Sequence, residues 1–226
     1  HGPGSRYATV FDIDWSPLKR ELEDKVLLPV LGEQYGAVLE NQDIRLLYEG
    51  GGFVVTYFQH RFPVAPQSWE GILSFRLDEL RARVAPQDED VEELLSILTG
   101  LRNLPRRNER DSERIAERYR EARIIKRRLS ALVEHSETIR AHLSASVETY
   151  NGIKGDSASF DRLDALLNEQ SYRLASWRVA SEEINYRRFF DINELAAIRA
   201  EETRVFDESH RLVFRLLKSG VATGLR

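Results

Sequence analysis

Residues 109–150 of the chain are ERDSERIAERYREARIIKRRLSALVEHSETIRAHLSASVETY. Apolar residues recur in this stretch at spacings of three and four, which place them on one face of an α-helix. Asn151 and Gly152 then end the pattern. We therefore expect a long helix or a helical hairpin, with an apolar seam formed by Ile115, Tyr119, Ala122, Ile125, Leu129, Leu132, Ile139, Leu143, Val147 and Tyr150.

Shorter helical patterns flank this stretch on both sides. Residues 69–83 carry apolar positions at helical spacing. Asp88 begins a second helix with an acidic first turn, which the positive end of the helix dipole favours. Polar residues at 156–159 can cap a short helix that runs to Leu167. The region of about residues 70–170 is therefore interpreted as a helical subdomain.

The segment before the helices has the composition of strands. Residues 43–49 and 53–58 are rich in β-branched and aromatic residues, and three glycines join them, which predicts a β-hairpin. Residues 25–32 are a short apolar run, consistent with a buried strand or loop. Two prolines exclude residues 60–66 from the centre of a sheet, because proline donates no ladder hydrogen bond. We expect a small antiparallel sheet within about residues 1–69.

The last part of the chain alternates strand and helix patterns, an order typical of the βαβ unit of a parallel sheet or barrel. Residues 201–218 are strongly amphipathic, and Ser219 and Gly220 can cap them. The expected order is a strand at 172–178, an extended segment at 184–191, a helix from Asp191 or Asn193 to Ala200, the helix at 201–218, and a strand from Val221.

Composition excludes several classes of protein. The chain has 226 residues and a net charge of −4, with 33 Lys and Arg against 37 Asp and Glu, so it is neither disordered nor basic. It has no Cys, and its 5 His show no metal-binding spacing, so we expect no metal site and no cofactor. The arginines of residues 105–128 alternate with acidic residues, which argues against nucleic acid as a partner. A run of about 18 apolar residues and a secretory signal are both missing, so we expect no membrane partner. The absence of Met indicates a processed or excerpted piece.

Residues 184–194, INYRRFFDINE, contain the densest cluster of groups suited to contact a ligand. Aromatic faces stack on sugar rings, and Arg, Asn and Asp side chains bond to hydroxyls. The composition fits a sugar site and a buried aromatic junction with salt-bridged arginines equally well. In residues 11–15, Asp12 and Asp14 lie on one side of an extended segment, where they could hold a cation or sugar hydroxyls, or cap a loop.

The order of the motifs distinguishes these interpretations. Seven motifs, taken in their order along the chain, resemble the maltooligosyl trehalose synthase family. They are GPGSRYA at 2–8, FDIDW at 11–15, KVLLPVLG at 25–32, HRFP at 60–63, YRLASWR at 172–178, EINYRRFFDINEL at 183–195 and GLR at 224–226. The block at 185–195 is the most specific, whereas residues 86–150 carry no diagnostic motif. The resemblance implies substrate-binding roles for Asn185, Tyr186, Arg187, Arg188, Phe189, Phe190, Asp191 and Asn193, with Tyr7, Asp12, Asp14, Trp15 and His60 as weaker candidates.

The resemblance also implies a fold. The family belongs to the α-amylase superfamily, built on a (β/α)8 barrel with a long insertion after the third strand. This chain would be an internal fragment of such an enzyme, α+β and mainly helical. Residues 1–184 would form an insertion (B-type) domain, with the sheet at about 1–69 and the helical subdomain at about 70–170. Residues 185–226 would be a barrel segment leading into strand four.

The activity implied by the resemblance is an intramolecular transglucosylation. The reducing-end α-1,4 linkage of a maltooligosaccharide would become α,α-1,1, in a cytoplasmic enzyme whose partner enzyme is a maltooligosyl trehalose trehalohydrolase. The family's Asp nucleophile follows two positions after the arginine that Arg226 matches, so Arg226 would orient a nucleophile that this chain lacks. The chain alone would then be inactive. Another amylase-type hydrolase or glucanotransferase, and a helical interaction module without catalysis, stay open as alternatives.

Overall fold

The computed structural model describes residues 2–5, 7–190 and 192–223. At its centre lies an antiparallel sheet in the order β2 (Ile44–Glu49), β3 (Gly52–Tyr57) and β4 (His60–Pro63). The predicted hairpin is confirmed, since β2 pairs with β3 and the glycines between them turn the chain with positive φ. β4 contains Pro63, which has no N–H to donate to a neighbouring strand, and β4 accordingly lies at the edge of the sheet.

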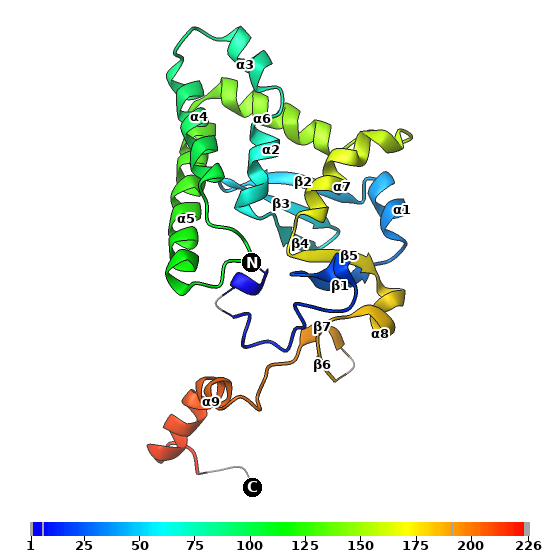
Figure 1. The fold of residues 1–226 in the computed structure, drawn as a ribbon, viewed down its shortest axis with the longest axis vertical. Helices are drawn as coiled ribbons and strands as arrows, with labels where there is room; N and C mark the ends of the chain where they lie inside the picture. Colours follow the sequence, from blue (N-terminus) through cyan, green and yellow to red (C-terminus); the bar gives the residue numbers. More distant parts are fainter. Residues whose placement is uncertain (1, 6, 191, 224–226) are drawn as a thin grey trace.

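Helices pack around this sheet, with α5 beside α4 and α6 crossing above the strands (Figure 1). The predicted seam at 109–150 belongs to two helices, because Ser136 ends one and caps the next by accepting a hydrogen bond from Ile139 N–H. The helix start predicted near Asp88 is confirmed, and the structure adds that the Asp88 side chain caps the helix by accepting from Val91 N–H. The pattern at 69–83 is divided between two helices. The helices are α2 (Trp69–Leu73), α3 (Leu77–Arg83), α4 (Glu89–Arg102), α5 (Ser112–His135), α6 (Glu137–Tyr150) and α7 (Asp161–Asn168).

An apolar core joins the sheet to the helices. Phe53 of β3 meets Trp69 of α2 edge to face, with 5.7 Å between the ring centroids. Leu129 of α5 and Leu163 of α7 lie in the same cluster and are fully buried. Burial of an apolar side chain of this size stabilises the fold by about 1.5–3 kcal/mol. The helical periodicity therefore identified the face that builds the core.

A parallel sheet joins two parts of the chain that are far apart in sequence. β1 (Val26–Leu31) pairs with β5 (Tyr172–Ser176), and Val26 lies opposite Tyr172. β5 falls in a segment predicted as a strand and β1 in one predicted as a buried strand or loop, but no local pattern indicates their pairing. Short elements flank these sheets, namely α1 (Tyr35–Glu40), α8 (Ala180–Glu183) and the 3-10 helices η1 (Gly2–Gly4), η2 (Arg20–Leu22), η3 (Pro66–Ser68), η4 (Ser157–Phe160) and η5 (Trp177–Val179).

The C-terminal part differs from the prediction. The helix expected from Asp191 or Asn193 is wrong, because β7 (Ile192–Ala196) is a strand that pairs antiparallel with β6 (Arg188–Phe189). No parallel βαβ unit forms within the described part of residues 171–226, and residues 221–223 are not a strand.

The predicted amphipathic helix is confirmed as α9 (Thr203–Lys218), and Gly220 follows it with a φ of 71°. Figure 1 shows α9 apart from the sheets and the other helices. Its apolar face is accordingly exposed at Phe206, Leu212, Val213, Phe214 and Leu217.

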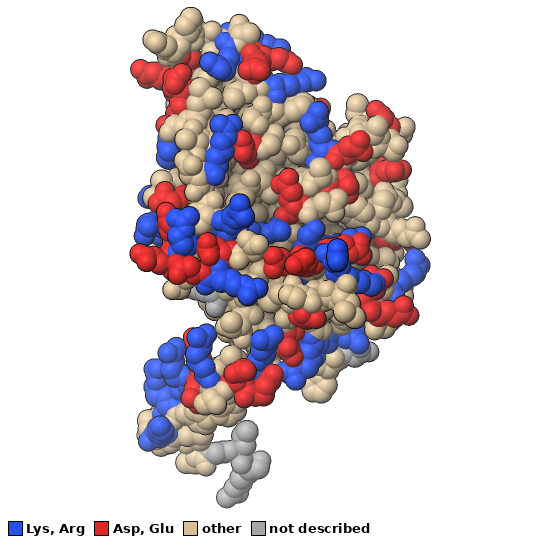
Figure 2. Space-filling view, in the orientation of Figure 1, with Lys and Arg blue, Asp and Glu red and all other residues tan. Residues whose placement is uncertain are grey.

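The described residues are thus mainly helical with small sheets, which confirms the fold class at that level. Acidic and basic side chains interleave over the visible face (Figure 2), and many form ion pairs, such as Arg128 with Glu93 between α5 and α4. Within the described ranges, no helix combines the length and the apolar character needed to cross a membrane.

Candidate functional site

The predicted sugar-binding block lies where three extended segments meet. Arg187 N–H donates to Asp12 O at 2.9 Å, Asp12 N–H donates to Ala197 O at 2.9 Å, and Ala197 N–H donates to Arg187 O at 2.7 Å. The segment near Asp12 is therefore held against both strands of the β6–β7 hairpin. We call this place the hairpin junction, formed by residues 10–14, 185–190 and 192–201.

Asn185 ties the hairpin junction to the parallel sheet. Its Oδ1 accepts a hydrogen bond from Leu27 N–H at 2.9 Å, and its Nδ2 donates to Asp14 O at 2.7 Å and to Lys25 O at 2.8 Å. Asn185 is 8 % exposed. Both amide protons and one oxygen lone pair are thus used by the main chain.

Asp12 is held by two guanidinium groups. Its Oδ2 lies 2.9 Å from Arg187 Nε, and its Oδ1 lies 3.4 Å from Arg199 Nε. Arg187 Nη2 also contacts Glu201 at 3.2 Å. A hydrogen bond from the main-chain N–H of Glu201 itself, and then the hydrogen bond from Arg187, keep the pKa of Glu201 below its usual value. Asp14 accepts a hydrogen bond from Ser16 N–H. Asp12 and Asp14 thus serve an ion-pair cluster and a turn, and they do not face a shared ligand position.

The tip of the hairpin presents two phenylalanine rings to solvent. Phe189 is 52 % exposed and Phe190 is 82 % exposed. Their ring centroids lie 4.7 Å apart in an edge-to-face arrangement. Phe190 has a φ of 54°, a conformation that is costly for a bulky residue and that projects its ring outward.

Polar contacts hold the base of this tip. The Tyr186 hydroxyl donates to Asn193 O at 2.6 Å, and burial raises the pKa of Tyr186, so the group remains a protonated donor. Arg188 Nη1 donates to Asn193 Oδ1 at 2.8 Å. Asn193 therefore accepts from both sides, through its main chain and its side chain. Asp191 lies outside the described residues.

The weaker candidates are spread over the molecule. Tyr7 is half-exposed in a turn, and Trp15 has a buried Nε1 without a hydrogen-bond partner in the described structure. His60 begins β4 of the three-stranded sheet and stacks with Tyr57 and Phe62. Arg226 lies outside the described residues.

No sequence pattern singles out Arg199, which joins residues 192–201 to Asp12 within the hairpin junction. Its Nη2 also donates to Ile13 O at 3.3 Å. Because residues 191–200 were expected to be helical, Arg199 was not placed opposite residues 10–14. A strand predicted at residues 191–200 would have placed Arg199 beside residues 10–14, which carry Asp12 and Asp14. The junction can thus present aromatic surface from a polar base, in which Asp12 is paired with two guanidinium groups.

Comparisons with known proteins bear on the predicted resemblance. No model of a protein family matches the chain. A putative maltooligosyl trehalose synthase of Mycobacterium tuberculosis strain H37Rv is 44 % identical over 62 residues, and the protein of strain CDC 1551 matches equally. The resemblance is therefore confirmed over that segment, which covers 27 % of this chain and 8 % of the relative's length.

Solved structures with similar titles also align with the chain. The maltooligosyltrehalose synthase of Arthrobacter ramosus aligns at 24 % identity and a TM-score of 0.43, covering 96 % of this chain and 16 % of that protein. A glycosyltrehalose synthase, DSM5389, aligns at 21 % identity and a TM-score of 0.41, covering 92 % and 17 %. TM-scores this low carry no argument about the fold, so the sequence match is the finding that counts.

Proposed function

We propose that this chain is part of an enzyme that converts the reducing-end α-1,4 linkage of a maltooligosaccharide into an α,α-1,1 linkage. The observation that carries the proposal is the 62-residue match, 44 % identical, to proteins named as maltooligosyl trehalose synthases. The order of the seven motifs along the chain supports it. Neither an amylase-type hydrolase or glucanotransferase nor a helical interaction module is favoured by these relatives.

The proposed reaction proceeds with retention at the anomeric carbon. An aspartate attacks the anomeric carbon of the glucosyl unit next to the reducing end, while a glutamic acid gives its proton to the departing O4. The released glucose stays in place, turns, and attacks the anomeric carbon of the glycosyl-aspartate through its own anomeric hydroxyl. This attack breaks the bond to the aspartate, which leaves as a carboxylate, and the hydroxyl proton returns to the glutamate. We propose that both carboxyl groups lie outside these 226 residues and that Arg226 orients the aspartate. The chain alone is then expected to form no trehalose ends.

The hairpin junction supplies the wall that retains the released glucose in this proposal. Phe189 and Phe190 are the exposed rings, suited to stack on the C–H face of a sugar. The side chains of Asn185, Tyr186 and Arg187 are used by the main chain or by acidic neighbours. We therefore assign them positioning roles and assign contact with the sugar to the two rings. A rigid aromatic wall of this kind excludes water during the transfer.

The finer elements of the fold belong to the same proposal. We propose residues 1–184 as an insertion domain, with the three-stranded sheet and the helical subdomain inside it, and residues 185–226 as a segment of a (β/α)8 barrel. The exposed apolar face of α9 supports this assignment, because a barrel helix packs on strands that other parts of the chain supply. A cytoplasmic location and a maltooligosyl trehalose trehalohydrolase as partner follow from the resemblance alone.

Replacing Phe190 with alanine in the full-length protein tests the proposed wall. Loss of one stacked ring corresponds to about 1.4 kcal/mol, so kcat/KM for maltooligosyl trehalose formation should fall about tenfold. Release of free glucose should rise, because water then competes with the retained sugar. Both products are measured from maltopentaose by chromatography.

Phe58 provides a matched control. It is 73 % exposed and has a φ of 49°, so it resembles Phe190 in both exposure and backbone conformation but lies beside the three-stranded sheet. The Phe58→Ala variant should keep the kinetics of the wild type. Equal kinetics for Phe190→Ala and wild type would refute the wall, and reducing products from the intact enzyme would refute the reaction.

A further inference from the structure

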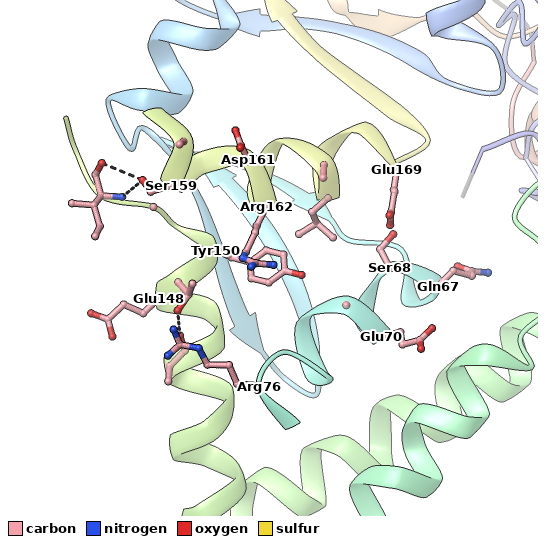
Figure 3. A pocket seen from close by; sticks show the side chains of 18 residues that line it. Gln67, Ser68, Glu70, Arg76, Glu148, Tyr150, Ser159, Asp161, Arg162 and Glu169 are labelled. Atoms are coloured by element: carbon pink, nitrogen blue, oxygen red, sulfur yellow. Dashed lines mark hydrogen bonds between the residues drawn. The ribbon is translucent and has the colours of Figure 1, made fainter. Parts of the chain in front are cut away.

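A wide hollow lies on the helical part of the molecule, separate from the hairpin junction. It has a volume of about 1080 Å³ and is bounded by α2, the end of α6 and α7 (Figure 3). Pockets that bind small molecules typically range from about 300 to 1,000 Å³. The hollow therefore has room for a ligand of more than one sugar ring.

Tyr150 provides a polar group at the centre of this hollow. The residue is only 7 % exposed, yet its hydroxyl has no hydrogen-bond partner among the described residues. Figure 3 shows its ring among the labelled side chains, with Arg162 beside it. A Cβ at position 71 would lie 3.2 Å from the hydroxyl, so Gly71 keeps space open there. Burial raises the pKa of Tyr150, so the hydroxyl stays neutral and able to donate.

The charges around the hollow are mixed. Glu148, Asp161 and Glu169 line it and form no ion pair within the described ranges, whereas Glu70 is paired with Arg102. The Arg162 guanidinium, which also lines the hollow, lies 4.6 Å from the centroid of the Phe75 ring, and this contact helps to hold its position.

This arrangement selects a chemical class of ligand. The excess of carboxylates disfavours a phosphate or another anion. The acidic groups are also too dispersed for a cation, since no group of three metal-binding side chains occurs in the part of the chain that the structure describes. Carboxylates and a guanidinium that are free to bond suit the hydroxyls of a neutral sugar.

We propose that this hollow is a second saccharide site, which binds a short α-1,4 glucan through the Tyr150 hydroxyl, Glu148 and Arg162. The choice of an α-1,4 glucan among neutral saccharides rests on the proposed function. The site retains substrate on the enzyme and takes no part in the chemical step.

The test uses maltotriose and the full-length protein. Hydrogen exchange should slow in residues 145–150 and 158–169 when maltotriose is added, and the concentration dependence of this protection gives its Kd. Tyr150→Phe keeps the ring and its contact with Phe75 but removes the hydroxyl. Loss of about 1 kcal/mol should weaken the local Kd about fivefold, with the unfolding midpoint unchanged. Glu148→Gln should weaken it similarly.

Glu137→Gln is the matched control, because Glu137 is an exposed residue of the same helix outside the hollow. It should bind maltotriose as the wild type does. Protection that is missing, or that is unaffected by Tyr150→Phe, overturns the second site even if the enzyme forms trehalose ends. Local protection that depends on Tyr150 upholds the second site even if no trehalose ends are formed, so the two proposals fail separately.

Discussion

The amide of Asn185 illustrates what a residue type reveals and what it conceals. The family resemblance implies that this side chain contacts a sugar, whereas the composition around it fits a sugar site and a structural junction equally well. In the structure, three main-chain groups from two other segments take up its hydrogen bonds. Local sequence could not reveal this, because Leu27 and Asp14 lie more than 150 residues away along the chain. An amide that supports the main chain of a site and an amide that contacts a ligand therefore look the same in the sequence.

Asn185→Ala should therefore loosen the joint between the hairpin junction and β1. Leu27 is 1 % exposed, so its N–H would lose its acceptor without gaining water. Unsatisfied buried groups of this kind cost about 2–4 kcal/mol in total. Amide exchange at Leu27 should accelerate accordingly, whereas Asn41→Ala, at an exposed position, should leave it unchanged. Wild-type exchange at Leu27 in the Asn185 variant would show that the amide does not hold this joint.

At the scale of elements, we expect the contact between α4 and α5 to depend on pH. His135 donates from Nδ1 to Ala131 O at 2.6 Å and from Nε2 to Asp90 Oδ1 at 2.9 Å, so both bonds require the imidazolium. The carbonyl of Ala131, and then Asp90, raise the pKa of His135 above 6.5. Hydrogen bonds from Ser136 and His135 lower the pKa of Asp90.

A histidine pKa raised on folding adds stability that is complete below pH 6.5 and is lost as pH rises through the folded value. The NMR titration midpoint of His135 should therefore lie above 6.5. It should move toward that value in Asp90→Asn, while Asp78→Asn, on α3, should not move it. A wild-type titration midpoint at or below 6.5 would contradict the ion pair between His135 and Asp90.

Elements with strong local signals were predictable, whereas those fixed by partners were not. The apolar period found the seam of α5 and α6, and the glycines found the β2–β3 turn. In contrast, Glu194, Leu195 and Ala196 favour a helix, yet they form β7 because Arg188 opposite Ala196 and the segment at 10–14 supply main-chain partners. Such pairings override the modest propensities of single residues.

At the scale of the whole molecule, the parallel pairing of β1 with β5 closes the chain around its helical part. Neither strand signals the other, because parallel partners leave no mark in local periodicity. The candidate site shows the same limit of sequence reasoning. The motif at 185–195 identified part of the hairpin junction, but it did not indicate the ion pair between Asp12 and Arg199. The sequence match covers 27 % of this chain and 8 % of the relatives' length, so the assignment of residues 185–226 to a barrel segment is a proposal that experiment can test.

The exposed apolar face of α9 gives a test of that proposal. Leu212 is 61 % exposed, so Leu212→Gln should change the unfolding midpoint of the 226-residue chain very little. In the full-length protein, a covered leucine contributes about 2 kcal/mol, so the same change should lower the midpoint clearly. Arg211→Gln, on the polar face of α9, is the control and should be neutral in both proteins. A neutral Leu212→Gln in the full-length protein would mean that α9 packs against nothing there, and the assignment of residues 185–226 to a barrel would fall with it.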